Sequence, residues 1–451
     1  MNSIGGKAVA SGAYGCVFKP ALKCKGKSRP NTGVISKLMV TKYANAEFDE
    51  IKKFSHIITK IPNFQKYFLI EPIEWCIPDK LSTGDKVEFD KKCGNLVKKG
   101  LKSSTINNDT ELSKLRIINM PDGGLDIDDY LKNNVISNKM LHMMNEKFKD
   151  LLLNAIIPMN KAGLYHLDIK AGNLLIDSDD QIRIVDWGLS GISTNKKAPD
   201  ILRGRPVQYN CPFSSLLINS MFLPEYKSYL KQTGVDYKLR LREFVINYYD
   251  KWSKHRGTGH EDYIEYIAKN IFMGKIPGIK YQSDIIRYNV SKTFIYNFLI
   301  VNLETFTKDG NFQEEAFMDV FLYNVDIWGL LMCYEPIFYY ARKKPAHVTL
   351  TPREPVLSKL MNVLLKYCFD NPAKKIPITS LVNDLNHINK MLAVPGAKIS
   401  NKPIKNPKKL TLVNTHSVSP MATVSKTQKK RTRCPNGTRK NKSPPPKCLP
   451  K

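Results

Sequence analysis

The feature that most constrains the fold is a set of polar residues and a glycine that recur at fixed spacing near the middle of the chain. Its six members are His166, Asp168, Lys170, Asn173, Asp186 and Gly188. If each residue type fills roughly one position in twenty, chance produces this spacing in such a chain on the order of once in 10⁵. Two short apolar runs, at residues 174–177 and 181–185, separate the two groups and are joined by a Ser-Asp-Asp turn. The pattern predicts a polar loop, a β-hairpin and a second polar turn.

These residue types suit phosphoryl transfer, which needs in-line geometry and screening of charge more than covalent chemistry by the protein. Asp168 would accept or orient the proton of a substrate hydroxyl, and Lys170 would neutralise charge on the moving phosphoryl group. Asn173 and Asp186 would both reach a Mg²⁺ ion, which prefers oxygen ligands. The alternative is an ordinary Asx-rich loop between a helix and a hairpin, which explains a single aspartate better than it explains the whole set.

Residues near the N-terminus would hold the phosphates of ATP. Residues 10–17 (ASGAYGCV) form a turn rich in small residues, and glycine lets the backbone approach a phosphate closely. Lys37 ends a strand-like run that resembles the V-A-I-K of protein kinases, and this resemblance implies that Lys37 binds the α- and β-phosphates. A helical pattern at residues 44–59 carries the partner of this lysine, for which Glu50 is preferred and Glu47, one turn earlier, is the alternative.

A linker between two parts of the chain would receive the adenine ring. Residues 117–124 (IINMPDGG) are an apolar run that ends in a turn. The backbone of Asn119 and Met120 would contact adenine, and Ile118 would lie at the back of the pocket. A strand that ends in a turn describes the same backbone. The residues expected to bind ATP are then Ala10, Gly12, Gly15, Val17, Lys37, Glu50, Asn119 and Met120.

Strand-like runs dominate the first part of the chain, and helical periodicity dominates the rest. The clearest helical pattern covers residues 138–162, and the strand-like runs cover residues 7–10, 16–20, 33–40, 67–76 and 115–119. A small β-rich lobe followed by a larger helical lobe is an α+β architecture.

The composition divides the chain further. We expect an N-terminal lobe at residues 1–118 and a C-terminal lobe at residues 119–395. The first contains a polar, Lys-rich surface insertion at about 79–114, and the second a long insertion at about 214–320.

Residues 396–451 would form a disordered basic tail. Residues 397–451 contain fifteen Lys or Arg and no Asp or Glu, so they carry +15 of the net charge of +29. So few apolar residues cannot offset the entropy of ordering. Such a tail would bind nucleic acid or an acidic protein through counterion release. A solubilising appendage is the alternative.

The nine scattered cysteines are typical of reduced thiols in a cytosolic compartment. The N-terminus lacks the apolar core of a signal peptide, and no run of about 18 uncharged apolar residues predicts a membrane span. We therefore expect a cytoplasmic protein. In the tail, Cys434 and Cys448 would either pair with each other or remain free.

Together these residues resemble a eukaryotic-type protein kinase, over roughly residues 9–388. The run from His166 to Asn173 is similar to the catalytic loop H-R-D-L-x-x-x-N, Asp186 begins a D-W-G similar to the metal-binding D-F-G, and Lys37 ends a run similar to V-A-I-K. The resemblance implies a two-lobed kinase fold, ATP and Mg²⁺ as cofactors, and Ser/Thr hydroxyls of proteins as phosphate acceptors, with Asp168 as the catalytic base. It also implies that Asp326 anchors the backbone of the catalytic loop.

Three short strings are similar, more narrowly, to Ser/Thr kinases encoded by large nucleocytoplasmic DNA viruses. They are SGAYGCVFKPALK at residues 11–23, RPVQYNCPFSS at 205–215 and RCPNGTRKN at 433–441. This resemblance implies the cytoplasm of an infected host cell, or the virion, as the setting.

The sequence departs from the kinase pattern at several positions. Ala10 replaces the first glycine of the phosphate loop, and Leu167 replaces the arginine that usually reads an activation-loop phosphate. No A-P-E is present; residues 208–213 take its place, and Lys375 replaces the arginine that would pair with its glutamate. Two alternatives therefore stay open: a catalytically silent kinase-fold scaffold that binds nucleic acid or virion proteins, and a small-molecule kinase.

The long insertion contains His255 and His260, separated by Arg-Gly-Thr-Gly. Two histidines would begin a metal site, but no cysteine or further histidine follows nearby to complete it. A structured turn is the preferred interpretation.

Overall fold

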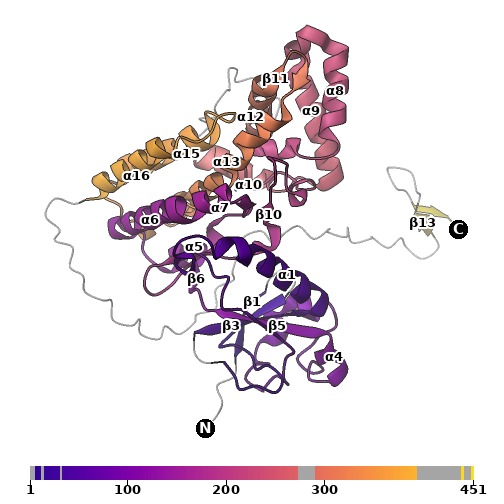
Figure 1. Cartoon of the computed structure of the whole chain (residues 1–451), viewed down its shortest axis with the longest axis vertical. Coiled ribbons are helices and arrows are strands. Elements are labelled where there is room, and N and C mark those ends of the chain that lie inside the picture. Colours follow the sequence, from indigo (N-terminus) through magenta and orange to yellow (C-terminus); the bar gives the residue numbers. More distant parts are fainter. Residues whose placement is uncertain are drawn as a thin grey trace. The chain divides into compact units, whose positions relative to one another are not determined.

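The computed structural model describes residues 6–11, 15–30, 33–272 and 290–393, together with two short strands in the tail. The chain divides into two compact units, Met1–Ala397 and Lys398–Lys451. In the larger unit the N-terminal strands form a β-sheet, and helices make up most of the rest (Figure 1). This mixed architecture agrees with the α+β prediction and is compatible with a kinase-like fold.

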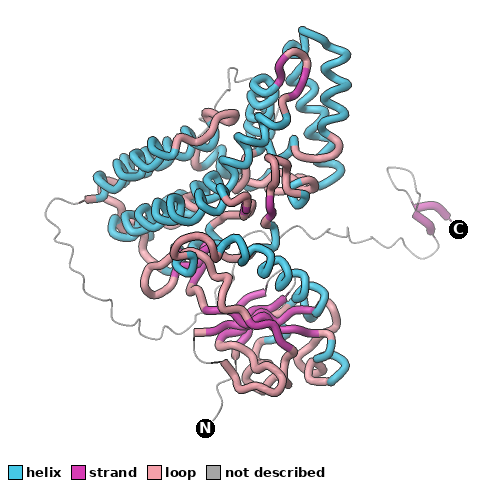
Figure 2. The backbone as a smooth tube through the Cα atoms, viewed as in Figure 1, coloured by secondary structure: helices cyan, strands magenta, loops and turns pink. Residues whose placement is uncertain are grey.

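One antiparallel sheet forms the centre of the N-terminal lobe (Figure 2). Its strands, in spatial order, are β1 (Lys7–Ser11), β2 (Gly15–Lys19), β3 (Val34–Val40), β5 (Leu115–Pro121) and β4 (Glu74–Cys76). Helix α1 (Thr41–Ile58) follows β3 without a loop and contacts both β3 and β5. The strands predicted from alternating apolar residues are therefore present, with one exception.

The exception is the strand predicted at residues 67–76, of which only Glu74–Cys76 pairs with the sheet. Pro72 interrupts the run, and proline has no N–H to donate to a ladder. The beginning of the run turns to the other lobe instead: the N–H of Ile184 donates to the carbonyl of Tyr67 at 2.8 Å, and Phe68 forms a parallel bridge with Ile184.

The Lys-rich stretch at 79–114, which we predict to be a surface insertion, is folded, and most of its residues are exposed or partly exposed. It forms three short helices, α2 (Phe89–Lys92), α3 (Gly94–Val97) and α4 (Asp109–Ser113). Their lysines cover a sparse apolar set, of which Phe89, Leu96 and Ile106 are fully buried. These side chains pack with Phe18 and Leu38 of the sheet into a second hydrophobic core.

Four of the nine cysteines are paired, so the prediction of reduced thiols is wrong for them. Disulfides join Cys16 to Cys93 and Cys24 to Cys76. The partners are separated by 77 and 52 residues, and only tertiary packing brings them together. The first disulfide ties β2 to the folded stretch 79–114. Among the described cysteines, the three unpaired ones, Cys211, Cys333 and Cys368, are buried.

The C-terminal lobe is helical except for three short sheets, the largest being β6 (Leu125–Asp126), β8 (Leu174–Ile176) and β9 (Ile182–Ile184). The hairpin β8–β9 is the one that the sequence predicts. The predicted helix at 138–162 is also present, as α6 (Asn138–Leu151) and α7 (Ile157–Lys161), joined by a π-helical turn at Leu152–Ile156. Ser137 caps α6 by accepting a hydrogen bond from the N–H of Met140.

Helix α13 (Glu314–Met332) is buried over almost all of its second half and contacts α12. Further helices complete the described part of this lobe. They are α5 (Ile127–Asn133), α8 (Phe222–Thr233), α9 (Tyr237–Arg256), α10 (Glu261–Asn270), α12 (Val290–Phe306), α14 (Glu335–Lys343), α15 (Arg353–Leu364) and α16 (Ile378–Leu392). Within the described residues, one helical stretch, Glu314–Lys343, is long and apolar enough to cross a membrane, but 78% of its apolar window is buried inside the protein. Burial against other helices accounts for its apolar character.

The described parts of the long insertion at about 214–320, residues 214–272 and 290–320, are folded. Helices α8 and α9 pack together, and α9 also packs against α12 (Figure 1). The His255–His260 stretch is a structured turn, in which the N–H of His260 donates to the carbonyl of Val207 at 2.9 Å. Among the described residues, three potential metal ligands come close together at one place, and neither histidine is one of them.

Within the tail, the structure describes two strands, β13 (Thr438–Lys440) and β14 (Cys448–Pro450), which pair antiparallel. The disorder expected for the tail as a whole stays a prediction. The rest of the tail, including Cys434, lies outside the described residues.

Candidate functional site

Asp326 of α13 fixes the backbone of the predicted catalytic loop through hydrogen bonds. Its carboxylate is fully buried and accepts hydrogen bonds from the backbone N–H groups of His166, at 2.9 Å, and Leu167, at 2.7 Å. Leu167 has a φ of 64°, an unusual conformation for a residue other than glycine. A buried carboxylate with two backbone donors can fix that conformation. The anchoring role expected of Asp326 is confirmed.

Gly329, one turn after Asp326 on α13, lets this loop lie directly against the helix. A Cβ atom at this position would lie 2.5 Å from the carbonyl oxygen of Ile169, closer than non-bonded atoms approach. A glycine is therefore required where the loop crosses α13.

The carboxylate of Asp168 is buried, 4% exposed, and surrounded by donors. The Lys170 ammonium lies 2.8 Å from its Oδ2, the Asn173 amide donates to the same oxygen at 3.0 Å, and the Asn210 amide donates to Oδ1 at 2.9 Å. Burial alone would raise the pKa of Asp168, but Lys170 and the hydrogen bonds outweigh it and hold the pKa below its ordinary value. The group is thus an ionised carboxylate at neutral pH, poised to accept a hydrogen bond.

The two predicted metal ligands lie on adjacent backbone segments joined by Val185. The N–H of Val185 donates to the carbonyl of Asn173 at 3.1 Å, and its own carbonyl lies 3.0 Å from Nε2 of His166. Asp186 comes next, with a φ of 67° and an exposed side chain. Carbonyl and carboxylate oxygens fit Mg²⁺, so the donor set suits the metal that the sequence implies.

Lys37 forms its ion pair with Glu47 and not with Glu50, which corrects the preferred assignment. The ammonium lies 2.6 Å from Oε2 of Glu47. Because α1 begins at Thr41, immediately after β3, its second turn is the one that lies over Lys37. Glu50 lies further along the helix, beside Asp186: burial, with the charges of Glu47 and Asp186, raises its pKa.

The residues expected to contact ATP divide between the two faces of the sheet. Val17 pairs with Lys37, and Lys37 pairs with Ile118, so these three side chains share the face covered by α1. Met120 packs against the same cluster as Ile118. Asn119 is different, because its side chain projects from the opposite face, where it bonds to Ser36.

The strand that contains Asn119 is also longer than we had predicted. Asn119 pairs with Ser36 on one side and Glu74 on the other, and β5 continues to Pro121. The turn into the second lobe therefore begins beyond Met120. Gly15 allows β2 to lie close to β3, because a Cβ atom there would lie 2.6 Å from the carbonyl oxygen of Leu38. Gly12 and the side chain of Ala10 lie outside the described residues.

Trp187, which follows Asp186, links the loop to α1 through aromatic contacts. Its ring centroid lies 5.0 Å from that of His166, 6.0 Å from Phe54 of α1 and 5.9 Å from Phe68. Trp187 is 4% exposed, so this stack is part of the core between the lobes. The tryptophan that stands in D-W-G where kinases have the phenylalanine of D-F-G therefore packs into this core.

Two carboxyl groups of the C-terminal lobe have pKa values above the ordinary range. Burial, with the charges of Asp126 and Asp129, raises the pKa of Asp128 on α5 to about 6. Burial, with the charge of Asp128, raises that of Glu335 at the start of α14 to about 7. Glu335 is 2% exposed and accepts a short hydrogen bond from Tyr263. Burial thus favours the protonated form of both groups.

Sequence reasoning assigned no role to two residues of the site. Arg205 is 7% exposed and donates to the carbonyls of Leu167, at 2.7 Å, and Leu189, at 2.6 Å. Asn210 donates to Asp168. Both belong to the string RPVQYNCPFSS, whose similarity to other kinases was the available signal. Lys375, without its usual glutamate partner, pairs with Asp319 at 2.6 Å.

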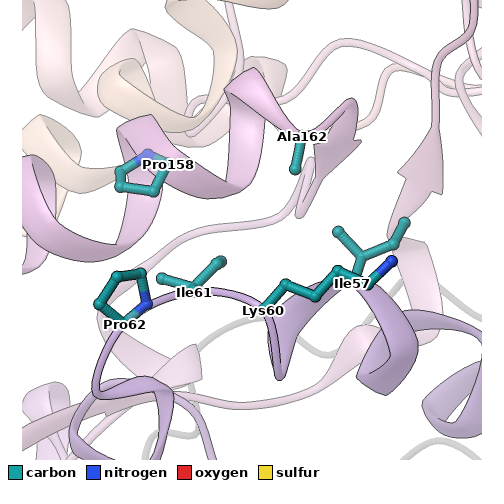
Figure 3. A pocket seen from close by; sticks show the side chains of 6 residues that line it. All are labelled: Ile57, Lys60, Ile61, Pro62, Pro158 and Ala162. Carbon is teal, nitrogen blue, oxygen red and sulfur yellow. The ribbon is translucent and has the colours of Figure 1, made fainter.

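Two of the cavities among the described residues contain no predicted site residue. The first, of about 270 Å³, lies between the end of α1 and α7 and is lined by Ile57, Lys60, Ile61, Pro62, Pro158 and Ala162 (Figure 3). The second, of about 260 Å³, lies beside α7 and α13 and includes Lys161, Lys196 and Lys375.

Comparison with curated proteins identifies protein kinases as relatives of parts of the chain. It is 24% identical over 148 residues to the probable serine/threonine-protein kinase KIN1 homolog of Encephalitozoon cuniculi (strain GB-M1), which covers 29% of this chain and 26% of that protein. It is 33% identical over 72 residues to CBL-interacting serine/threonine-protein kinase 2 of Arabidopsis thaliana, 16% of each chain. It is 31% identical over 64 residues to CBL-interacting protein kinase 15 of Oryza sativa subsp. japonica, 14% of this chain and 15% of that protein.

No family model matches the chain. The matched segments amount to 26% or less of the length of these relatives, at low identity. The similarity supports a eukaryotic-type serine/threonine protein kinase. None of these three relatives is viral by its name, and the predicted similarity to kinases of large DNA viruses stays a prediction.

Proposed function

We propose that the protein transfers the γ-phosphate of ATP to serine or threonine hydroxyls of other proteins. The arrangement around Asp168 is the observation that carries the proposal. A depressed pKa keeps its carboxylate ionised, Lys170 lies 2.8 Å away, and Asn173 contacts both its backbone and its side chain. This is the geometry needed to orient a hydroxyl and to neutralise charge beside it.

In this proposal each residue has one task. Asp168 accepts a hydrogen bond from the substrate hydroxyl and takes its proton as the phosphoryl group moves, while Lys170 neutralises charge on that group. Asn173 and Asp186 would hold Mg²⁺, which when bound screens the charge of the phosphates. Lys37, oriented by Glu47, would bind the α- and β-phosphates. Val17 and Met120 would contact the nucleotide from the sheet.

The test is phosphotransfer from labelled ATP by the purified full-length chain, with Mg²⁺ and with generic basic and acidic protein acceptors. Asp168→Ala should reduce the rate by about 10²–10⁴-fold, the usual contribution of a positioned general base. Asp180→Asn, in the exposed turn of the β8–β9 hairpin, is the matched control and should retain activity. Wild-type turnover by Asp168→Ala would exclude this function.

A second candidate is a silent kinase fold used as a scaffold, or a kinase of small molecules. The observation in its favour is the replacement of A-P-E by residues 208–213, packed against the folded insertion. Stabilisation by ATP that requires Mg²⁺, without turnover on any protein acceptor, would favour the scaffold. Turnover on small hydroxyl compounds alone would favour a small-molecule kinase.

The tail at 397–451 would dock the enzyme on nucleic acid or on an acidic protein, since it carries +15 and no acidic residue. Such binding should weaken steeply with salt. We place the protein in the cytoplasm, or in the virion if the chain is viral. Because disulfides persist in oxidising surroundings, the two disulfides favour the virion over the cytoplasm.

A further inference from the structure

The N-terminal lobe contains one group of side chains with the composition of a metal site. The Sγ atoms of Cys24 and Cys76 and a carboxylate oxygen of Glu74 lie within 4.8 Å of one another. No other three described residues of these ligand-forming types group so closely. The phosphoryl-transfer function uses none of the three.

The fold brings these donors together by simple β geometry. Glu74 and Cys76 are two residues apart on β4, and alternate residues of a strand project from the same face. Cys24 reaches that face from the connection between β2 and β3, where it forms an antiparallel bridge with Pro78. Sγ of Cys24 lies 3.5 Å from Oε2 of Glu74. The backbone therefore positions all three donors.

Polar neighbours contact the Glu74 carboxylate and the Cys24 sulfur. Lys27 lies 2.7 Å from Oε1 of Glu74, and the Asn119 amide donates to Oε2 at 3.0 Å. The same Asn119 amide lies 3.4 Å from Sγ of Cys24. A carboxylate and two sulfurs with hydrogen-bonded neighbours have the second layer of contacts that metal ligands require.

We propose that Cys24, Glu74 and Cys76 bind a zinc ion when a thiol reductant has opened the Cys24–Cys76 disulfide. Reduction by a dithiol breaks the S–S bond, transfers two electrons and two protons to the sulfurs, and leaves the reductant as its own disulfide. Zinc then displaces the two thiol protons to solvent, because the ligand is the thiolate.

The geometry and the charge both suit Zn²⁺. Two thiolates at about 2.3 Å from a tetrahedral ion are about 3.8 Å apart. Rotation of the side chains can reach this separation without moving the backbone, since the Cα atoms of Cys24 and Cys76 are 5.8 Å apart. Two thiolates and Glu74 carry −3, so zinc leaves −1, which Lys27 neutralises. Water would fill the fourth position, as in zinc sites with three protein ligands.

The site is linked to the strand that carries Lys37, but on the opposite face of the sheet. Asn119, which contacts two of the three ligands, accepts a hydrogen bond from Ser36, and Ser36 immediately precedes Lys37 on β3.

The probe is Co²⁺, which replaces zinc and gives an absorption band when a thiolate binds it. The full-length chain is reduced with dithiothreitol until the disulfide thiols titrate, desalted without oxygen and titrated with Co²⁺. We expect a thiolate band that saturates at one Co²⁺ per chain, vanishes on addition of Zn²⁺ and is absent from the oxidised protein. Cys24→Ser should abolish the band, and Glu74→Gln should weaken Co²⁺ binding by about 10–100-fold.

Matched variants separate this site from the other cysteines. The double variant Cys16→Ser/Cys93→Ser removes the other disulfide, and Cys434→Ser/Cys448→Ser removes the tail thiols; both should keep the band. The proposal is overturned if the reduced wild type gives no band, or if the band survives in Cys24→Ser. Should Cys24→Ser fail to fold, an unweakened band in Glu74→Gln would overturn it equally.

Discussion

The amide of Asn210 donates a hydrogen bond of 2.9 Å to Oδ1 of Asp168, although 42 residues separate them. Lys170 and Asn173 contact the other oxygen, Oδ2, so Asn210 alone among these neighbours fixes the rotation of the carboxylate from the far side. The segment that takes the place of A-P-E thus reaches back into the candidate site.

We predict that Asn210→Ala lowers the rate of phosphotransfer by about 10–100-fold, because a hydrogen bond to a charged group contributes about 1.5–3 kcal/mol. The loss should appear in kcat and leave the KM for ATP unchanged. Steady-state kinetics at varied ATP measures both. Ser190→Ala, which removes a 3.2 Å hydrogen bond to the carbonyl of His166, is the control and should have a small effect. An equal loss in both variants would argue for a general structural role.

The ion pair of Lys37 distinguishes two neighbouring glutamates. Glu47→Gln should weaken ATP binding and lower activity about tenfold or more, because Lys37 loses the partner 2.6 Å away that orients it. Glu50→Gln should change both quantities little. Calorimetric titration with ATP and Mg²⁺ measures the affinity. A greater loss in Glu50→Gln would restore the assignment that the sequence favours.

Stability should fall as the pH rises from about 4.5 to about 7. The pKa of Glu335 is raised from 4.5 to about 7, so its protonated form stabilises the fold below pH 4.5 and that contribution is lost by the time the pH passes 7. Glu335→Gln, which cannot ionise, should raise the Tm at pH 8 and change it little at pH 5. Thermal unfolding at both pH values is the measurement. The idea fails if the substitution lowers the Tm equally at the two values.

Removal of the Cys16–Cys93 disulfide should destabilise the N-terminal lobe. The cross-link closes a stretch of 77 residues, and such links contribute about 2–5 kcal/mol. The double variant Cys16→Ser/Cys93→Ser should show a lower midpoint of chemical unfolding, and its residues 79–114 should be cleaved sooner by protease. Cys368→Ser, at a buried unpaired cysteine, controls for loss of a thiol. Identical midpoints for the double variant and the wild type would show that the link does not stabilise the lobe.

Local patterns in the sequence were sufficient for several elements. Strand β3 with Lys37, the loop from His166 to Asn173 and the β8–β9 hairpin follow from alternation, spacing and turn residues that lie within a few positions of each other. The role of Asp326 followed from the resemblance to protein kinases, and it is consistent with the need of a buried aspartate for donors.

The choice between Glu47 and Glu50 could not be made in this way. Both lie on one helix pattern, and the rotation of α1 relative to the sheet decides which of them faces Lys37. The contribution of residues 79–114 to the second hydrophobic core could not be predicted for a related reason. Their few apolar residues, such as Phe89 and Ile106, show no clear period, and their lysines dominate the composition.

The sequence by itself determined which residues carry the candidate chemistry, because Asp168, Asn173 and Asp186 are close along the chain and their spacing encodes their geometry. Only the tertiary structure decided the partners of these residues and of the cysteines. Asn210 meets Asp168, and Cys16 meets Cys93, over separations of 42 and 77 residues. Contacts at such separations depend on how whole elements pack, which no local pattern of residues specifies.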